Sequence, residues 1–223
     1  MPGIGAVDLG CLAYFSESVS EQATADVLHS TLLAQLVADR EAIRATDPAA
    51  WRASYRMSLS KLQWVLQGES SDTIFVKDRP LLVEDAVLPR VATGPADTAG
   101  LSWTITVFRL LPATNDAVAR FNGEVLNGKG ACQLQVCVVT QSGDAPEMCL
   151  VDIDYTTATA TTDPLIDPIQ PSDDAVATVV TLSGILDEDA YAAIRASVDV
   201  KVGSRIREDI TRLAGQAPRA VAA

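Results

Sequence analysis

Apolar residues recur every three or four positions along several stretches of the chain, and this spacing predicts amphipathic helices. The first stretch, 18–44, carries leucines at four-residue intervals. The second begins at Asp47, an N-cap candidate followed by proline, and ends near Gly68. A short polar connection joins the two stretches, so we expect them to form an N-terminal helical hairpin.

Four further helices are expected along the rest of the chain. Their predicted ranges are 81–92, 98–111, 115–126 and a long C-terminal helix over 187–213. The segment 98–111 is apolar nearly all round, so it is either buried or the part that could enter a membrane. It is too short to span a membrane as a helix.

Alternation of apolar and polar residues, typical of β-strands, covers 131–140, 148–155 and 175–184. A short β-branched run at 73–76 indicates an additional edge strand. Because one face of each strand is polar, we expect an antiparallel sheet with helices packed on its other face. The predicted fold class is α+β, with a small antiparallel sheet of three to four strands, several covering helices, the N-terminal helical hairpin and the long C-terminal helix.

Residues 17–214 are expected to form a single α+β domain, followed by a flexible tail over 215–223. Residues 1–16 contain three glycines and read as an extended arm. Its apolar side chains must be covered either by the chain's own sheet or by a neighbouring copy, and we expect the neighbour. Deleting the arm should then leave a folded chain. The arm residues expected to interact are Ile4, Val7, Leu9, Leu12, Tyr14 and Phe15.

Charge divides the chain into acidic and basic regions. Its net charge is −12, which argues against nucleic acid as a partner. Between Lys129 and Arg195 no Lys or Arg occurs, whereas eleven acids do. Basic residues gather elsewhere, so we expect an acidic region to meet a basic helix face, within one molecule or between copies. The basic interaction candidates are Arg52, Arg56, Arg205 and Arg207.

No motif of a known catalytic or metal site is present, so no catalytic residue, resident metal or cofactor is expected. The four cysteines lack the spacing of metal ligands, and we expect them to pack as small apolar side chains. His29 is the only histidine of the sequence. Asp152 and Asp154 share one strand face, and Asp163 and Asp167 lie in a loop. These four acids are weak candidates for a metal site.

The favoured function is that of a non-enzymatic, self-assembling or partner-binding structural protein of the bacterial cytoplasm. The cytoplasm is expected because the first 30 residues lack Lys and Arg, and so lack the basic part of a secretory or transit leader. The order of helical hairpins, sheet and final helix is similar to that of small bacterial cytolysins, although no shared motif allows residue roles to be carried over. That resemblance implies the alternative, a membrane-active, pore-forming protein. A hydrolase using a carboxylate pair is the third possibility.

Overall fold

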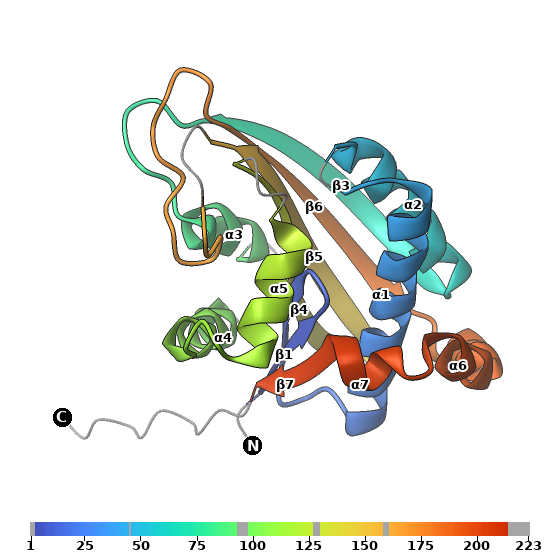
Figure 1. Cartoon of the computed structure of the whole chain (residues 1–223). Coiled ribbons are helices and arrows are strands. Elements are labelled where there is room, and N and C mark those ends of the chain that lie inside the picture. Colours follow the sequence, from blue (N-terminus) through green and yellow to red (C-terminus); the bar gives the residue numbers. More distant parts are fainter. Residues whose placement is uncertain (1–2, 45, 93–97, 127–129, 158–160, 214–223) are drawn as a thin grey trace, which may run out of the picture.

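The computed structural model of the chain contains one mixed β-sheet with helices on both faces (Figure 1). It describes residues 3–44, 46–92, 98–126, 130–157 and 161–213. Within these residues seven strands lie in the order β3-β6-β5-β4-β2-β1-β7. The strands are β1 (Ile4–Asp8), β2 (Cys11–Phe15), β3 (Trp64–Phe75), β4 (Ala131–Ser142), β5 (Ala145–Thr156), β6 (Val176–Leu186) and β7 (Ile210–Leu213). The helices are α1 (Glu21–Glu41), α2 (Pro48–Lys61), α3 (Val83–Val91), α4 (Thr98–Leu110), α5 (Asp116–Val125), α6 (Glu188–Val202) and α7 (Arg205–Asp209).

The four long strands β3, β6, β5 and β4 pair antiparallel, as their alternating sequence predicts. A tight turn with Gly143 at φ 61° connects β4 to β5. Next to β4 the direction changes, because β2 runs parallel to β4 and then pairs antiparallel with β1. Strand β7 completes the sheet beside β1.

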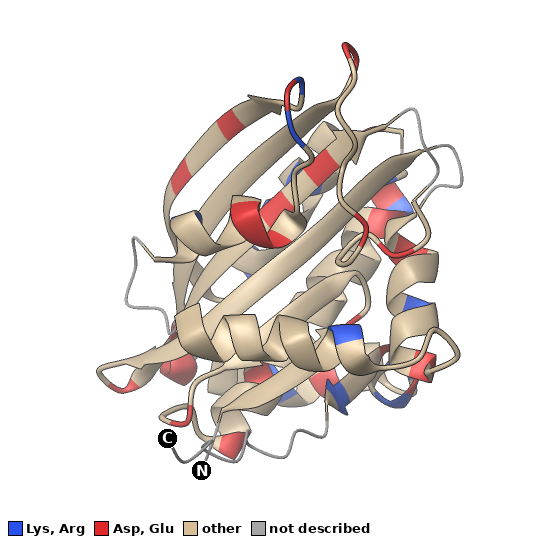
Figure 2. Cartoon of the chain, turned by 90° about the vertical axis from the view of Figure 1, so that its left-hand side faces the viewer, with Lys and Arg blue, Asp and Glu red and all other residues tan. Residues whose placement is uncertain are grey.

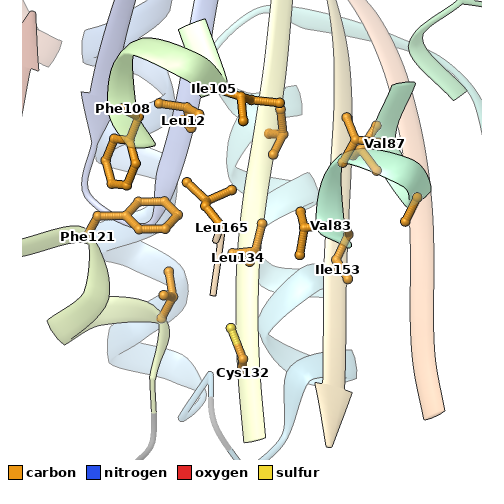
Figure 3. Close-up of a cluster of buried hydrophobic side chains, with 14 of the residues drawn as sticks. Leu12, Val83, Val87, Ile105, Phe108, Phe121, Cys132, Leu134, Ile153 and Leu165 are labelled. Atoms are coloured by element: carbon orange, nitrogen blue, oxygen red, sulfur yellow. The ribbon is translucent and has the colours of Figure 1, made fainter. Parts of the chain in front are cut away.

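Each face of the sheet is covered by its own helices, so the molecule has two main hydrophobic cores (Figure 1). Helices α1, α2 and α6 cover one face, where the rings of Trp51 and Tyr55 stack 5.2 Å apart. Helices α3, α4 and α5 cover the other, where Phe108 and Phe121 meet edge to face at 5.3 Å (Figure 3). The strands between these layers therefore bury side chains in both directions.

The α+β class is confirmed, but the predicted small antiparallel sheet is wrong. The observed sheet has seven strands and is mixed, because residues 4–15 contribute two strands and 210–213 a third. Strands β1 and β2 are buried on both faces, so their sequence lacks the alternation that identified the other strands. The short strand predicted at 73–76 is the end of β3, whose polar middle is exposed at the sheet edge.

The predicted long C-terminal helix is also wrong. Helix α6 stops at Val202 because Gly203 adopts a φ of 51°, which a right-handed helix cannot accommodate. The chain then forms the short helix α7 and strand β7. The tail predicted at 215–223 lies outside the described residues.

The predicted N-terminal helical hairpin corresponds to α1 and α2, which pack against each other. Ser20 caps α1, and Asp47 caps α2 by accepting a hydrogen bond from the backbone N–H of Ala50 at 3.0 Å. Helix α2 is shorter than expected. It ends at Lys61, and Gln63 at φ 69° turns the chain into β3.

Candidate functional site

Asp152 on β5 is the centre of a polar layer buried between α2 and the sheet. Its side chain accepts hydrogen bonds from the amides of Gln133, at 3.2 Å to each oxygen, and Gln135, at 3.2 Å. Nη1 of Arg52 on α2 lies 3.1 Å from Asp152 and also binds Asp154. Burial raises the pKa of Asp152, and the Arg52 guanidinium opposes that rise. We call these five residues the Asp152 layer; they attach α2 to the sheet.

The sequence predicted that Asp152 and Asp154 share a face, but not that Arg52 bridges them. Asp152 is only 3% exposed, and both of its carboxylate oxygens accept hydrogen bonds from side chains of the protein. The two carboxylates therefore do not face a common open cleft across which a substrate could lie. In this geometry their chemistry is that of a buried ion pair.

A second buried polar cluster lies beside the first, at the turn between β1 and β2. Asp8 is 1% exposed, and one of its oxygens accepts a hydrogen bond from Thr31 of α1 at 2.6 Å. Gln35 donates to the Asp8 carbonyl oxygen at 3.0 Å and accepts from the backbone N–H of Gly10 at 3.2 Å. Burial raises the pKa of Asp8 to about 7, and the Thr31 hydrogen bond only partly offsets this.

Arg44 connects this cluster to α2. Its guanidinium lies 4.1 Å from the Trp51 ring centre, and Nη2 donates to Gln35 at 3.2 Å. The backbone of Gly10 lies directly beneath Nη1, so a Cβ at that position would collide with it. This cluster was missed from the sequence. The sequence signals it left were Asp8, the one charged residue of the apolar segment 1–16, and the polar residues Thr31 and Gln35 on the buried side of α1.

The predicted interaction residues of the arm lie inside the chain's own sheet. Ile4 is partly buried, and the others pack into the cores on the two faces of β1 and β2. Figure 3 shows Leu12 beside Phe108 in one of these cores. In this structure these side chains are therefore not available to a second copy.

The predicted basic residues have different surroundings. Arg52 belongs to the Asp152 layer, and Arg56 pairs with Glu69 of β3. Arg205 pairs with Asp209 one helical turn away, and Arg207 is exposed without an ion pair among the described residues. The predicted meeting of the acidic region with a basic helix face thus occurs within one molecule for Arg52, whereas the partner of Arg56, Glu69, lies outside that acidic region.

Other charged residues form two separate surfaces. The acidic surface comprises Asp144, Asp187, Glu188 and Asp189 around a groove of about 560 Å³. The basic surface comprises Arg40, Lys201 and Arg205 around a groove of about 700 Å³ between α1 and the end of α6. The one acid among the residues that line this groove, Asp39, is bound by Arg44 and by the Trp51 indole. Charged residues in general lie mostly on helices and turns, whereas most of the strand surface is uncharged (Figure 2).

Asp163 and Asp167, the two loop acids proposed as weak metal candidates, accept hydrogen bonds from backbone N–H groups of their own loop. Asp167 accepts hydrogen bonds from the backbone N–H groups of Thr162, at 2.9 Å, and Asp163, at 3.0 Å. Burial acts to raise the pKa of Asp167, but these hydrogen bonds outweigh it and lower the pKa. In the part of the chain that the structure describes, no three His, Cys, Asp or Glu side chains are grouped to hold a metal ion.

His29 and the buried pair of Cys11 and Cys137 each have their partner within the chain. Nδ1 of His29 is 2.8 Å from a carboxylate oxygen of Asp199, which links α1 to α6. Cys11 and Cys137 are buried together, and the hydrogen bond between them, followed by burial, raises the pKa of the Cys11 thiol. A thiol held in its protonated form is a poor nucleophile.

Comparison with known proteins adds only a general likeness of shape. No family model matches the chain, and no curated protein matches it in sequence. One similar solved structure is described as the Evf virulence factor, with a TM-score of 0.39 and 8% identity over 95% of this chain and 84% of that one. Another is described as a delta-endotoxin, with a TM-score of 0.41 and 8% identity over 80% of this chain and 81% of that one. At these TM-scores the likenesses support no inference about function.

Among the described residues, no helix combines the length and the apolar character that crossing a membrane requires. Helix α4, the segment singled out as buried or membrane-entering, buries Leu101, Ile105 and Phe108 against the sheet. At its end Leu110 is 79% exposed.

Proposed function

We propose that the chain is a self-assembling protein whose copies join head to tail, the acidic surface of one against the basic surface of the next. The observation that carries this proposal is the division of charges into paired and unpaired groups. Arg52, Arg56 and Arg195 each bind an acid of the same chain. Within the described residues, in contrast, the four acids of the acidic surface and Arg40 and Lys201 of the basic surface form no ion pair.

The two surfaces lie at opposite ends of α6. Asp187, Glu188 and Asp189 begin this helix, and Lys201 is in its last turn. A helix of 15 residues is about 22 Å long at a rise of ~1.5 Å per residue. This separation prevents the surfaces from pairing within one molecule but suits a contact between different surfaces of successive copies. Such a contact produces a ring or an open filament.

Each surface also contains apolar side chains, which a stable interface needs at its centre. The basic surface includes Leu33, Leu36 and Val37 of α1. The acidic surface includes Ile185 and Val65, and Val65 is 56% exposed. The charges would then select the partner surface and its orientation, while the apolar side chains supply the buried area.

Sedimentation velocity at low and high salt tests the proposal. Because exposed charges are screened over about 10 Å at 0.1 M salt, assemblies held in register by them should dissociate as salt rises from about 50 to 500 mM. A chain that stays monomeric at low salt and high protein concentration would contradict the proposal.

Charge-reversal variants identify the surfaces. The acidic variant Asp144→Lys with Asp189→Lys leaves the helix cap Asp187 intact, and the basic variant is Arg40→Glu with Lys201→Glu. Each variant alone should remain monomeric, because its two surfaces no longer attract each other: the acidic surface goes from four negative charges to no net charge in the first variant, and the basic surface becomes net negative in the second. A mixture of the two should associate. The matched control, Asp78→Lys with Asp173→Lys, makes the same change in net charge at exposed sites outside both surfaces and should assemble normally.

A membrane-active protein is the second candidate function. It is favoured by Leu110, exposed at the end of α4 beside the partly buried Val107 and Leu111. Release of a dye from anionic liposomes, compared between the chain and Leu110→Ser, tests this candidate. Equal absence of release from both would remove it.

A further inference from the structure

The groove of the basic surface has the size of a ligand site. Helix α6 packs along α1 through contacts that include Asp26 with Arg195 and His29 with Asp199. The groove lies beyond these contacts, between α1 and the last turn of α6. Its volume of about 700 Å³ falls within the roughly 300–1,000 Å³ that is typical of sites for small molecules.

The floor of the groove is an aliphatic stripe of α1, formed by Leu33, Leu36 and Val37, which are all partly exposed. Leu33 and Leu36 pack on the buried side chains of Leu32 and Val202, which hold the floor in place. Because exposed apolar area is unfavourable in water, an apolar ligand group that covers this stripe is favoured.

The rim of the groove carries exposed cations that have no ion pair. Arg40 on α1 and Lys201 on α6 are both exposed, and neither pairs with an acid among the described residues. Arg205 pairs with Asp209, and Asp39, the acid of the lining, is bound by other side chains. Arg40 and Lys201 are therefore the cations that a ligand anion can reach.

We infer that this groove binds a free amphipathic carboxylate, whose head group lies between Arg40 and Lys201 and whose alkyl chain covers the aliphatic stripe. Leu33 and Arg40 lie two turns apart on α1, about 10 Å at a rise of ~1.5 Å per residue, which is about the length of a ten-carbon chain. The acidic surface of another copy offers the same two features, carboxylates beside apolar side chains, so the ligand competes with the proposed assembly contact. Binding itself does not depend on that contact.

Binding is measured on the full, isotope-labelled chain by NMR titration with decanoate below its micelle concentration. Two probes each lack one half of the ligand: acetate has no alkyl chain, and decan-1-ol has no charge. We expect saturable shifts with decanoate, centred on Leu36, Val37 and Lys201. Each buried methylene strengthens binding about fourfold, so acetate should bind at least about a hundredfold more weakly. Decanol should bind at least about tenfold more weakly. No saturable shift with decanoate, or equal binding of either probe, would overturn the inference.

Arg40→Gln with Lys201→Gln removes both cations of the head-group site and should weaken decanoate binding by about tenfold or more. Its matched control, Lys61→Gln with Arg79→Gln, makes the same change in net charge at exposed positions outside the groove. The control should bind decanoate as the parent chain does. Unchanged binding in the first variant would place the ligand elsewhere on the molecule.

The acidic variant Asp144→Lys with Asp189→Lys separates this inference from the proposed assembly. Its basic surface is intact, so it should bind decanoate at least as tightly as the parent chain, whether or not copies associate. Loss of binding in this variant would overturn the inference, whereas binding by a parent chain that never assembles would contradict only the proposed function. If the parent chain assembles, saturating decanoate should dissociate the assemblies.

Vesicles of phosphatidylglycerol separate a free ligand from a bilayer, because they present anionic head groups without a free single chain. We expect the chain to bind decanoate and to remain in the supernatant when these vesicles are sedimented. Sedimentation with the vesicles, combined with no saturable binding of decanoate, would assign the groove to a membrane surface and overturn the inference.

Discussion

At the scale of single residues, the ionisation of the buried Asp8 carboxyl couples the stability of the chain to pH. Its pKa is about 7 in the folded chain, against an ordinary value of 3.8, because it is fully buried. Between these values the unfolded chain loses the proton while the folded chain keeps it. The protonated Asp8 carboxyl therefore contributes fully to the free energy of unfolding below pH 3.8, and this contribution is lost as pH rises through about 7. At ~1.4 kcal/mol per pH unit the loss is of the order of 4 kcal/mol.

Asp8→Asn should remove this dependence, because the amide oxygen still accepts the Thr31 hydrogen bond but does not ionise. We expect urea unfolding to show the variant as more stable than the parent chain at pH 8, with the difference shrinking toward pH 4. The exposed Asp78→Asn serves as the control. A difference that is the same at both pH values would mean that Asp8 does not titrate in this range.

At the scale of elements, two glycines in different backbone conformations give opposite predictions for substitution by alanine. Gly203 ends α6 at φ 51°, where a Cβ is strained, so Gly203→Ala should destabilise the chain by about 1–2 kcal/mol. Gly123 lies within α5, and an added Cβ would meet nothing within 4 Å. Gly123→Ala should therefore stabilise the chain by roughly 0.5–1 kcal/mol. Thermal unfolding measures the stability of both variants. If both are more stable than the parent chain, or both less stable, this assignment is contradicted.

The same elements explain what the sequence could and could not predict. Strands β4, β5 and β6 were predictable, because each has one face whose polar residues alternate with apolar ones. Strand β2 was not, because a sequence buried on both faces has no period. In the Asp152 layer, the shared face of Asp152 and Asp154 follows from strand geometry alone. Their partner Arg52 lies 100 residues from Asp152, and only the packing of α2 on the sheet brings them together.

At the scale of the whole molecule, the β1–β2 hairpin holds the sheet together. It lies between β4 and β7, and each of its strands contributes to the cores on both faces. Removing it would separate β7 from the rest of the sheet and uncover both helical layers. The sequence alone had suggested that residues 1–16 could be deleted without unfolding the chain; the placement of the hairpin leads to the opposite expectation.

Deletion of residues 1–16 should therefore abolish cooperative thermal unfolding, followed by far-ultraviolet circular dichroism. A milder variant keeps the test quantitative if the truncated chain is insoluble. Leu12→Ala leaves the hairpin in place but opens a cavity at a side chain that is fully buried, and should cost about 2–5 kcal/mol. Val200→Ala, at an exposed apolar position on α6, is the control and should change stability little. If the truncated chain still unfolds in one sharp transition, or Leu12→Ala behaves like the control, the hairpin is not the centre of the sheet in solution, and its apolar residues are free to bind another copy.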